Sequence, residues 1–263
     1  MLLSKADINK YNEDGVIVLR GVFDDWISDL KSGADFNINN PSGRALVHKK
    51  EDDSGILFED FSNWKRIKQY TDFVTNSNLG RISAELMNSN SVQFFHDHYL
   101  HKYPGSMVAT PWHQDIPYYF VDGDQTVSFW IPLTKMDKEF SLRCAIGSHK
   151  LSKYVRPTSW SSNQNFYKDS NLFMDLPNMD DGNFEIMQWS MSPGDAIAFN
   201  YKLIHSAGAN TTDNETQTLS MRVIGDDVSY IERPGKTSPH YDNLNQKNGD
   251  RLREDWFPFI YKS

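Results

Sequence analysis

The chain has 263 residues with a formal net charge of −8, and 38% of them are hydrophobic, enough for a sizeable core. The acidic balance argues against nucleic acid or an anionic membrane as a partner, because both require a basic face. The single cysteine, Cys144, excludes a disulfide framework and an all-cysteine zinc site. The sequence shows no secretory signal and no apolar stretch of membrane-spanning length, so we expect a soluble, cytoplasmic protein.

The first 90 residues predict helices around one strand. Gly15 is a turn signal in front of a buried apolar run, and Ile82 and Leu86 lie at helical spacing. The expected elements are a helix over 5–13, a strand over 15–19, a helix over 24–31, a loop over 33–60 and one or two helices over 62–89.

After residue 90 the pattern changes to short strands. In the first of them His96, His98 and Lys102 share one face by the period-two rule. A long irregular insert is expected over 150–183. The expected strands cover 91–103, 125–132, 142–146, 184–189, 196–199 and 216–224. Helices followed by such strands predict a mainly β fold with supporting helices, either a β-sandwich or a jelly-roll barrel.

No Pro-, Gly- or Ser-rich linker divides the chain, so we expect a single domain. Its parts would be helical support over about 1–90, a jelly-roll core over about 91–230 and a C-terminal tail over 231–263.

The segment Trp112-His113-Gln114-Asp115 carries the strongest chemical signal. In an extended segment His113 and Asp115 project to the same side and can reach one ion together. His205, just after the expected strand 196–199, is a candidate second histidine. Two histidines and one carboxylate on one face of an octahedron form the site of non-haem Fe(II) oxygenases. The alternative is that His113 and Asp115 form a turn pair and His205 belongs to the core.

A second histidine cluster is a rival metal site. His96 and His98 could coordinate zinc together, whereas His101 lies on the opposite face of the strand. No cysteine is near in sequence to complete a tetrahedral set, so a structural role is favoured for at least two of them. The sequence also lacks phosphate-binding glycine motifs and a nucleophile elbow, so nucleotide-binding and hydrolase folds are not indicated.

Six motifs in order resemble the phytanoyl-CoA dioxygenase family of Fe(II)- and 2-oxoglutarate-dependent oxygenases. The resemblance runs nearly end to end and implies a double-stranded β-helix, a cupin-type jelly roll, with His113, Asp115 and His205 as iron ligands. Its motifs are Asp14–Phe23, Lys102–Gly105 with Thr110–Asp115, Ser128–Leu133, Ala145–His149, Pro193–Phe199 followed by His205, and Ser220–Val228.

One position departs from the family pattern. Where the family usually has an arginine that pairs with the far carboxylate of 2-oxoglutarate, this chain has Thr216. Arg222 follows on the same strand face, with Thr216 and Ser220, and its guanidinium suits a carboxylate. We expect Arg222 to be the clamp, unless it only forms a surface ion pair, with Lys102 as the reserve. The resemblance also implies that Trp130 and His98 lie along the cosubstrate.

The resemblance implies an enzyme that uses Fe(II), 2-oxoglutarate and O2 to hydroxylate an unactivated C–H bond of a small molecule, releasing succinate and CO2. Candidate substrate-pocket residues, which could equally be core, are Trp112, Tyr118, Tyr119 and Arg143. Alternatives are desaturation, epoxidation or ring closure at the same iron, a related halogenase, which Asp115 disfavours, or a non-catalytic jelly-roll binding module. The substrate and the oligomeric state are not indicated.

Overall fold

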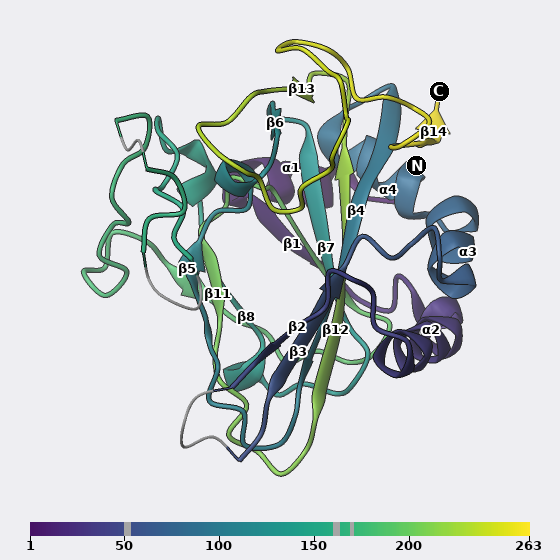
Figure 1. The fold of residues 1–263 in the computed structure, drawn as a ribbon, viewed down its shortest axis with the longest axis vertical. Helices are drawn as coiled ribbons and strands as arrows, with labels where there is room; N and C mark the ends of the chain where they lie inside the picture. Colours follow the sequence, from purple (N-terminus) through teal and green to yellow (C-terminus); the bar gives the residue numbers. More distant parts are fainter. Residues whose placement is uncertain (50–53, 160–163, 169–170) are drawn as a thin grey trace.

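A computed structural model describes residues 1–49, 54–159, 164–168 and 171–263. Two antiparallel sheets face each other across an internal space, with helices on the outer side of the larger sheet (Figure 1). This is the predicted jelly roll. No helix among the described residues is long and apolar enough to cross a membrane.

The described residues of the N-terminal part form four α-helices and three strands. The helices are α1 (Lys5–Asp14), α2 (Ile27–Asn39), α3 (Lys68–Asn76) and α4 (Leu79–Met87), and the strands are β1 (Val16–Leu19), β2 (Leu46–His48) and β3 (Leu57–Phe61). A capping box between Ser4 and Asp7 begins α1, and Gly15, in the left-handed conformation with φ 78°, ends it and leads into β1. The loop expected over 33–60 was wrong, because α2, β2 and β3 occupy much of it.

The remaining strands form the two facing sheets and a small third one. They are β4 (Ser91–Lys102), β5 (Thr110–His113), β6 (Val121–Asp122), β7 (Thr126–Pro132), β8 (Leu142–Ala145), β9 (Ile186–Met187), β10 (Ala196–Phe199), β11 (His205–Ala207), β12 (Thr216–Ile224), β13 (Ser229–Tyr230) and β14 (Phe259–Lys262). Short 3-10 turns lie at Asp24–Trp26, Ile116–Tyr118, Lys138–Phe140 and Ser148–Lys150.

Within the described residues the major sheet has the order β1-β10-β7-β12-β4-β3-β2, with β14 added alongside β4. The minor sheet has the order β5-β11-β8-β9, and β13 pairs with β6. The segment expected as a C-terminal tail therefore contributes a strand to the major sheet. It also supplies Leu252 and Phe257 to an apolar cluster with Phe95.

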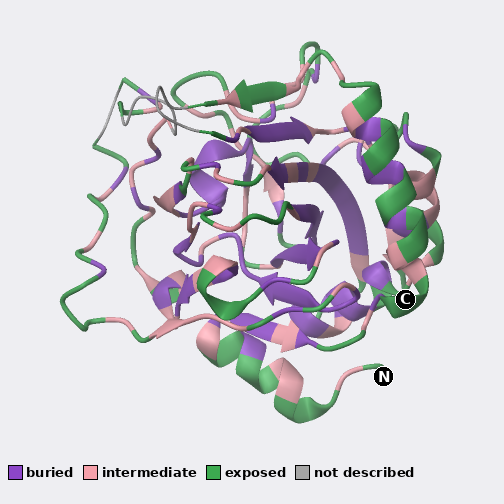
Figure 2. Ribbon diagram, turned by 90° about the horizontal axis from the view of Figure 1, so that it is seen from below, coloured by how far each residue is buried: buried purple, intermediate pink, exposed green. Residues whose placement is uncertain are grey.

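Alternation along the major sheet separates the core from the internal space. Tyr99 of β4, Leu219 of β12 and Phe129 of β7 face the helices in the largest apolar cluster. Their sequence neighbours turn to the other side, between the sheets, and most residues of the central strands are buried (Figure 2). A register shift between Arg222 and Val223 of β12, opposite β4, changes the facing residues at that end.

Candidate active site

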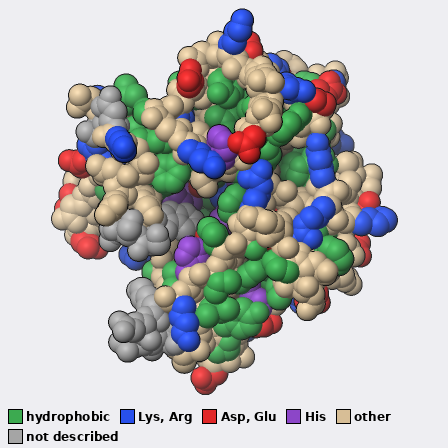
Figure 3. Space-filling view, viewed as in Figure 1, with side chains coloured by type: hydrophobic (Ala, Val, Ile, Leu, Met, Phe, Trp, Pro, Cys, Tyr) green, Lys and Arg blue, Asp and Glu red, His purple; other side chains and the backbone are tan. Residues whose placement is uncertain are grey.

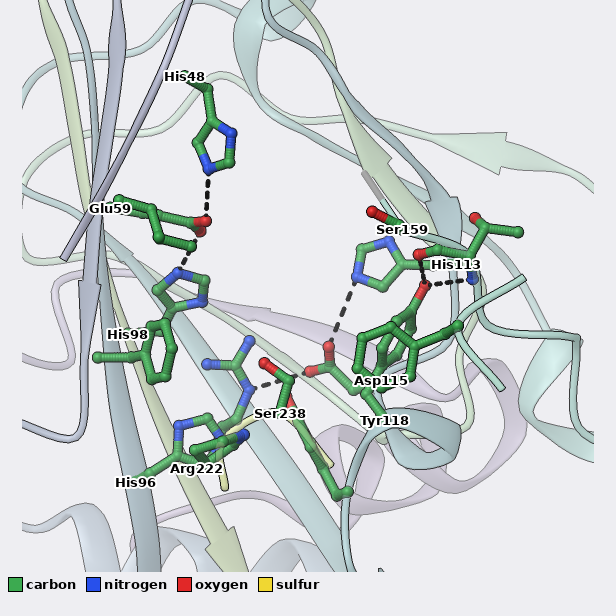
Figure 4. Close-up of a pocket in the computed structure, with 16 residues that line it drawn as sticks. His48, Glu59, His96, His98, His113, Asp115, Tyr118, Ser159, Arg222 and Ser238 are labelled. Atoms are coloured by element: carbon green, nitrogen blue, oxygen red, sulfur yellow. Dashed lines mark hydrogen bonds and ion pairs between the residues drawn. The ribbon is translucent and has the colours of Figure 1, made fainter. Parts of the chain in front are cut away.

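Two neighbouring strands of the minor sheet position the predicted histidines. His113 at the end of β5 is the direct antiparallel partner of His205 in β11. Asp115 follows at the start of a 3-10 turn, and its Oδ1 lies 3.5 Å from His113 Nε2 and 3.9 Å from His205 Nε2. All three residues are buried, and their ligand atoms lie within 4.8 Å of one another (Figure 4 labels His113 and Asp115).

Backbone carbonyls orient both imidazole rings. His113 Nδ1 lies 2.8 Å from the Pro111 oxygen, and His205 Nδ1 lies 3.0 Å from the Leu203 oxygen. Because a carbonyl oxygen can only accept, each Nδ1 donates and each Nε2 is left as the metal-binding atom. Burial, and then the neighbouring His113, lower the pKa of His205 to about 3, which keeps it in the neutral form that binds metal. The donor set fits a divalent iron ion.

Arg222 of β12 contacts the other oxygen of the Asp115 carboxylate. Its Nε donates to Asp115 Oδ2 at 3.1 Å. Burial alone would raise the pKa of Asp115, but the guanidinium of Arg222 and the two histidines hold it well below its usual range. Arg222 Nη1 is buried and has no hydrogen-bond partner among the described residues. The residue expected to clamp the cosubstrate thus contacts a candidate metal ligand, and Oδ1 of Asp115 faces the histidines.

Replacing Arg222 with glutamine is expected to weaken metal binding about tenfold or more, because partners of metal ligands typically contribute 10–100-fold to affinity. Calorimetric titration of the variant with Mn(II) measures its metal affinity. An unchanged Mn(II) affinity would show that Asp115 does not need the guanidinium.

An inner cavity extends from the metal ligands along the major sheet. Its lining includes His113 and His205 at one end and, from the major sheet, the residues His98, Lys102, Trp130, Thr216 and Ser220. Lys102 is opposite Thr216 in the β4–β12 register. Its Nζ donates to the Gly208 carbonyl at 2.5 Å, and burial lowers its pKa to about 8. No ion-pair partner for this ammonium is found in the described part of the chain.

An outer cavity of about 200 Å³, compared with about 60 Å³ for the inner one, has His113 and Asp115 in its wall. Both cavities include His98, His113 and Arg222 in their walls. Tyr118 and Tyr119 line the outer cavity. Histidine side chains are visible near the centre of the view in Figure 3, next to hydrophobic ones.

Trp112 and Arg143 lie elsewhere. Each directly neighbours a residue that lines the inner cavity, namely His113 and Leu142, so strand alternation turns it to the outer face of the minor sheet. There the Arg143 guanidinium lies 4.7 Å from the centre of the Trp112 ring. Neither residue is among those that line the two cavities, and both are half-buried, with Trp112 packed against the apolar cluster of Ala145, Val155, Met179 and Ile204. Their role as substrate-pocket residues stays a prediction.

The rival histidine cluster does not come together as a metal site. His96 and His98 line the outer cavity, whereas His101, on the opposite face of β4, lies 3.0 Å from Glu215. Among the described residues, His113, Asp115 and His205 are the group whose ligand atoms have metal-binding spacing.

Two residues that sequence reasoning missed form a hydrogen-bonded chain with His98. Glu59 of β3 lies 2.7 Å from His48 Nε2 through one oxygen and 2.8 Å from His98 Nε2 through the other (Figure 4). Burial alone would raise the pKa of Glu59, but these two hydrogen bonds lower it to about 2. The signal available in the sequence was the period-two spacing of Leu57, Glu59 and Phe61, which puts them on one face of a strand. The assignment of this segment as a loop hid it.

Facing antiparallel sheets with a buried His–Asp–His group between them define the jelly-roll class to which non-haem iron oxygenases belong. The chain belongs to the phytanoyl-CoA dioxygenase family, whose model matches residues 11–217. This is a family of iron- and 2-oxoglutarate-dependent oxygenases, as the sequence motifs implied. No curated protein matches the chain.

Solved structures with the same fold include enzymes that catalyse different reactions. The α-ketoglutarate-dependent carbocyclase SnoK from nogalamycin biosynthesis has a TM-score of 0.78 at 18% identity, with 98% of this chain and 96% of that chain covered. The epimerase SnoN, in complex with Fe3+, α-ketoglutarate and nogalamycin RO, has a TM-score of 0.77 at 16% identity, with 97% and 98% covered. EctD from S. alaskensis, with 2-oxoglutarate and 5-hydroxyectoine, has a TM-score of 0.65 at 16% identity, with 85% and 76% covered.

Proposed function

We propose that the chain is an Fe(II)- and 2-oxoglutarate-dependent dioxygenase that hydroxylates an unactivated C–H bond of a small molecule. The observation that carries this is the buried group His113, Asp115 and His205, placed where two cavities meet. The reaction consumes O2 and 2-oxoglutarate, and gives the hydroxylated product, succinate and CO2. Iron supplies the activation of O2, and the protein supplies ligand geometry, orientation and a dry cavity.

In this proposal the inner cavity holds 2-oxoglutarate and the outer one the substrate. Lys102 binds the far carboxylate of 2-oxoglutarate, with the hydroxyl of Thr216 beside it. Two observations support the lysine over Arg222: its ammonium has no anionic partner among the described residues, and it lies at the end of the cavity away from Asp115. Arg222 lines the same cavity, and in this proposal its Nη1, which has no hydrogen-bond partner among the described residues, donates to the other end of the cosubstrate.

Substrate-stimulated release of succinate tests the function. The protein is loaded with Fe(II) and 2-oxoglutarate and screened against a metabolite panel, with product analysis for each active compound. A product with one added oxygen supports hydroxylation, whereas loss of two hydrogens or a new ring assigns desaturation or ring closure. Failure to bind Fe(II) and to consume 2-oxoglutarate would instead indicate that the protein is a non-catalytic binding module.

Chloride in the assay buffer is not expected to enter the product. Asp115 supplies an anionic oxygen to the metal, which occupies the position that a halide would need. Mass spectrometry of the product checks this, and a chlorine isotope pattern from the unmodified enzyme would contradict it.

A further inference from the structure

The outer cavity is lined by few ionised groups, and each already bonds to a group of opposite sign or to an imidazole. Only Nη1 of Arg222, assigned above to the cosubstrate, lacks a hydrogen-bond partner among the described residues. Among its described lining residues the carboxylates are Glu59 and Asp115, and the guanidinium is Arg222. Asp115 and Arg222 bond to each other. Both oxygens of Glu59 accept hydrogen bonds from imidazoles, and the bond to Glu59 raises the pKa of His48, which favours a neutral His48–Glu59 pair. A charged ligand would therefore meet no unpaired group of opposite sign on this wall.

The opposite wall is aromatic. The Tyr118 hydroxyl donates to the Thr158 carbonyl at 2.8 Å and accepts from the Thr158 amide at 2.9 Å, so the residue offers its ring to the cavity. Phe166 packs edge-on against that ring, with centroids 5.1 Å apart. In Figure 4 the chain of His48, Glu59 and His98 lies on one side, and His113, Asp115 and Tyr118 lie on the other.

We propose that the outer cavity binds a neutral, hydroxyl-bearing ring such as a sugar ring. Its hydroxyl groups bond to the His48–Glu59–His98 chain while its carbon face packs on Tyr118 and Phe166. Hydroxyl groups can both donate to the carboxylate oxygens and accept from imidazole nitrogens, and they bring no charge. The proposal rests on the proposed function for the ring's place beside the metal, and it names the substrate class of that site.

Matched probes separate the contributions of charge and hydroxyl groups. The protein is loaded with Mn(II) and 2-oxoglutarate, and binding is measured by calorimetry for four compounds. They are phenyl β-D-glucoside, the anionic phenyl β-D-glucuronide, the cationic phenyl 2-amino-2-deoxy-β-D-glucoside and the hydroxyl-free 2-phenoxytetrahydropyran. We expect the neutral glucoside to bind about tenfold more tightly than each of the others, as one lost or unpaired hydrogen bond would give.

The variant Glu59→Gln keeps the side-chain size and removes the carboxylate. We expect about tenfold weaker binding of the glucoside, with unchanged affinities for Mn(II) and 2-oxoglutarate. Glu215→Gln is the matched control, because Glu215 lies against His101 on the other face of β4 and lines neither cavity. It should leave glucoside binding unchanged.

Four results would overturn the proposal: no measurable binding of the glucoside, tighter binding of a charged analogue, equal binding of the hydroxyl-free compound, or no effect of Glu59→Gln. The comparison of probes uses the unmodified protein, so it stands even if the variant does not fold. Because Mn(II) replaces iron and no turnover is required, the result is independent of the succinate assay that tests the proposed function.

Discussion

Alanine in place of His113 or His205 is expected to abolish iron binding and turnover while leaving the fold intact. Each variant removes a metal ligand, and even the loss of an outer partner of a ligand lowers affinity by about 10–100-fold. The strands should persist, because β11 is paired with both β5 and β8 through backbone contacts. Titration with Fe(II), succinate release and thermal unfolding measure the three effects.

His101→Ala is the matched control for these variants. His101 is also a buried histidine in a strand, but it lies on the far face of β4 and bonds to Glu215. The iron affinity of the His101→Ala variant should stay near that of the unmodified protein. Near-normal turnover after the loss of His113 or His205 would end the assignment of the metal site.

Lys102→Ala is expected to raise the dissociation constant for 2-oxoglutarate by about tenfold or more, the effect of a lost charged hydrogen bond of at least about 1.5 kcal/mol. Calorimetry with Mn(II)-loaded protein measures it without turnover. Thr216→Val, which removes only a neutral hydroxyl, should have a smaller effect. If Lys102→Ala binds 2-oxoglutarate normally and Arg222→Ala does not, the arginine is the clamp.

The same lysine predicts a pH dependence. Its pKa in the free protein is lowered to about 8 by burial, and only the protonated ammonium pairs with the carboxylate. Below pH 8 the affinity for 2-oxoglutarate should be constant, and above it the affinity should fall about tenfold per pH unit. The other titratable lining groups are His98, His113, His205 and Arg222. Lys102→Ala should remove the loss of affinity between pH 8 and 9.5.

The metal group and the alternation of the strands could be predicted from the sequence, for different reasons. His113 and Asp115 are two residues apart, and the order of six motifs identified His205 as their distant partner. The period-two pattern placed His98 and Lys102 on one face of β4, and both line the inner cavity. The pairing of Arg222 with Asp115 could not be predicted, because it depends on how β12 in one sheet faces the turn after β5 in the other.

The segment 33–60 was misread because of its glycine and polar residues. Gly33 suggests the end of a helix, yet it lies inside α2, where an added Cβ would be 2.7 Å from the ring of Tyr70 in α3. The glycine allows α2 and α3 to pack closely. This contact between distant segments cannot be recognised from a single sequence. Likewise β14 forms only because β4 has an available edge segment at Val92 and Gln93, far away in the chain.

Side chains along β4 and β12 alternate between the inner cavity and the core. This alternation defines which positions to vary first in laboratory evolution of the enzyme. Leu100, Thr218 and Ser220 line the inner cavity, whereas Tyr99 and Leu219 pack against the helices in the largest apolar cluster. A combinatorial library confined to the first three positions can reshape the cavity without removing apolar area from the largest cluster. Variants drawn from it should therefore differ in cosubstrate preference far more than in melting temperature.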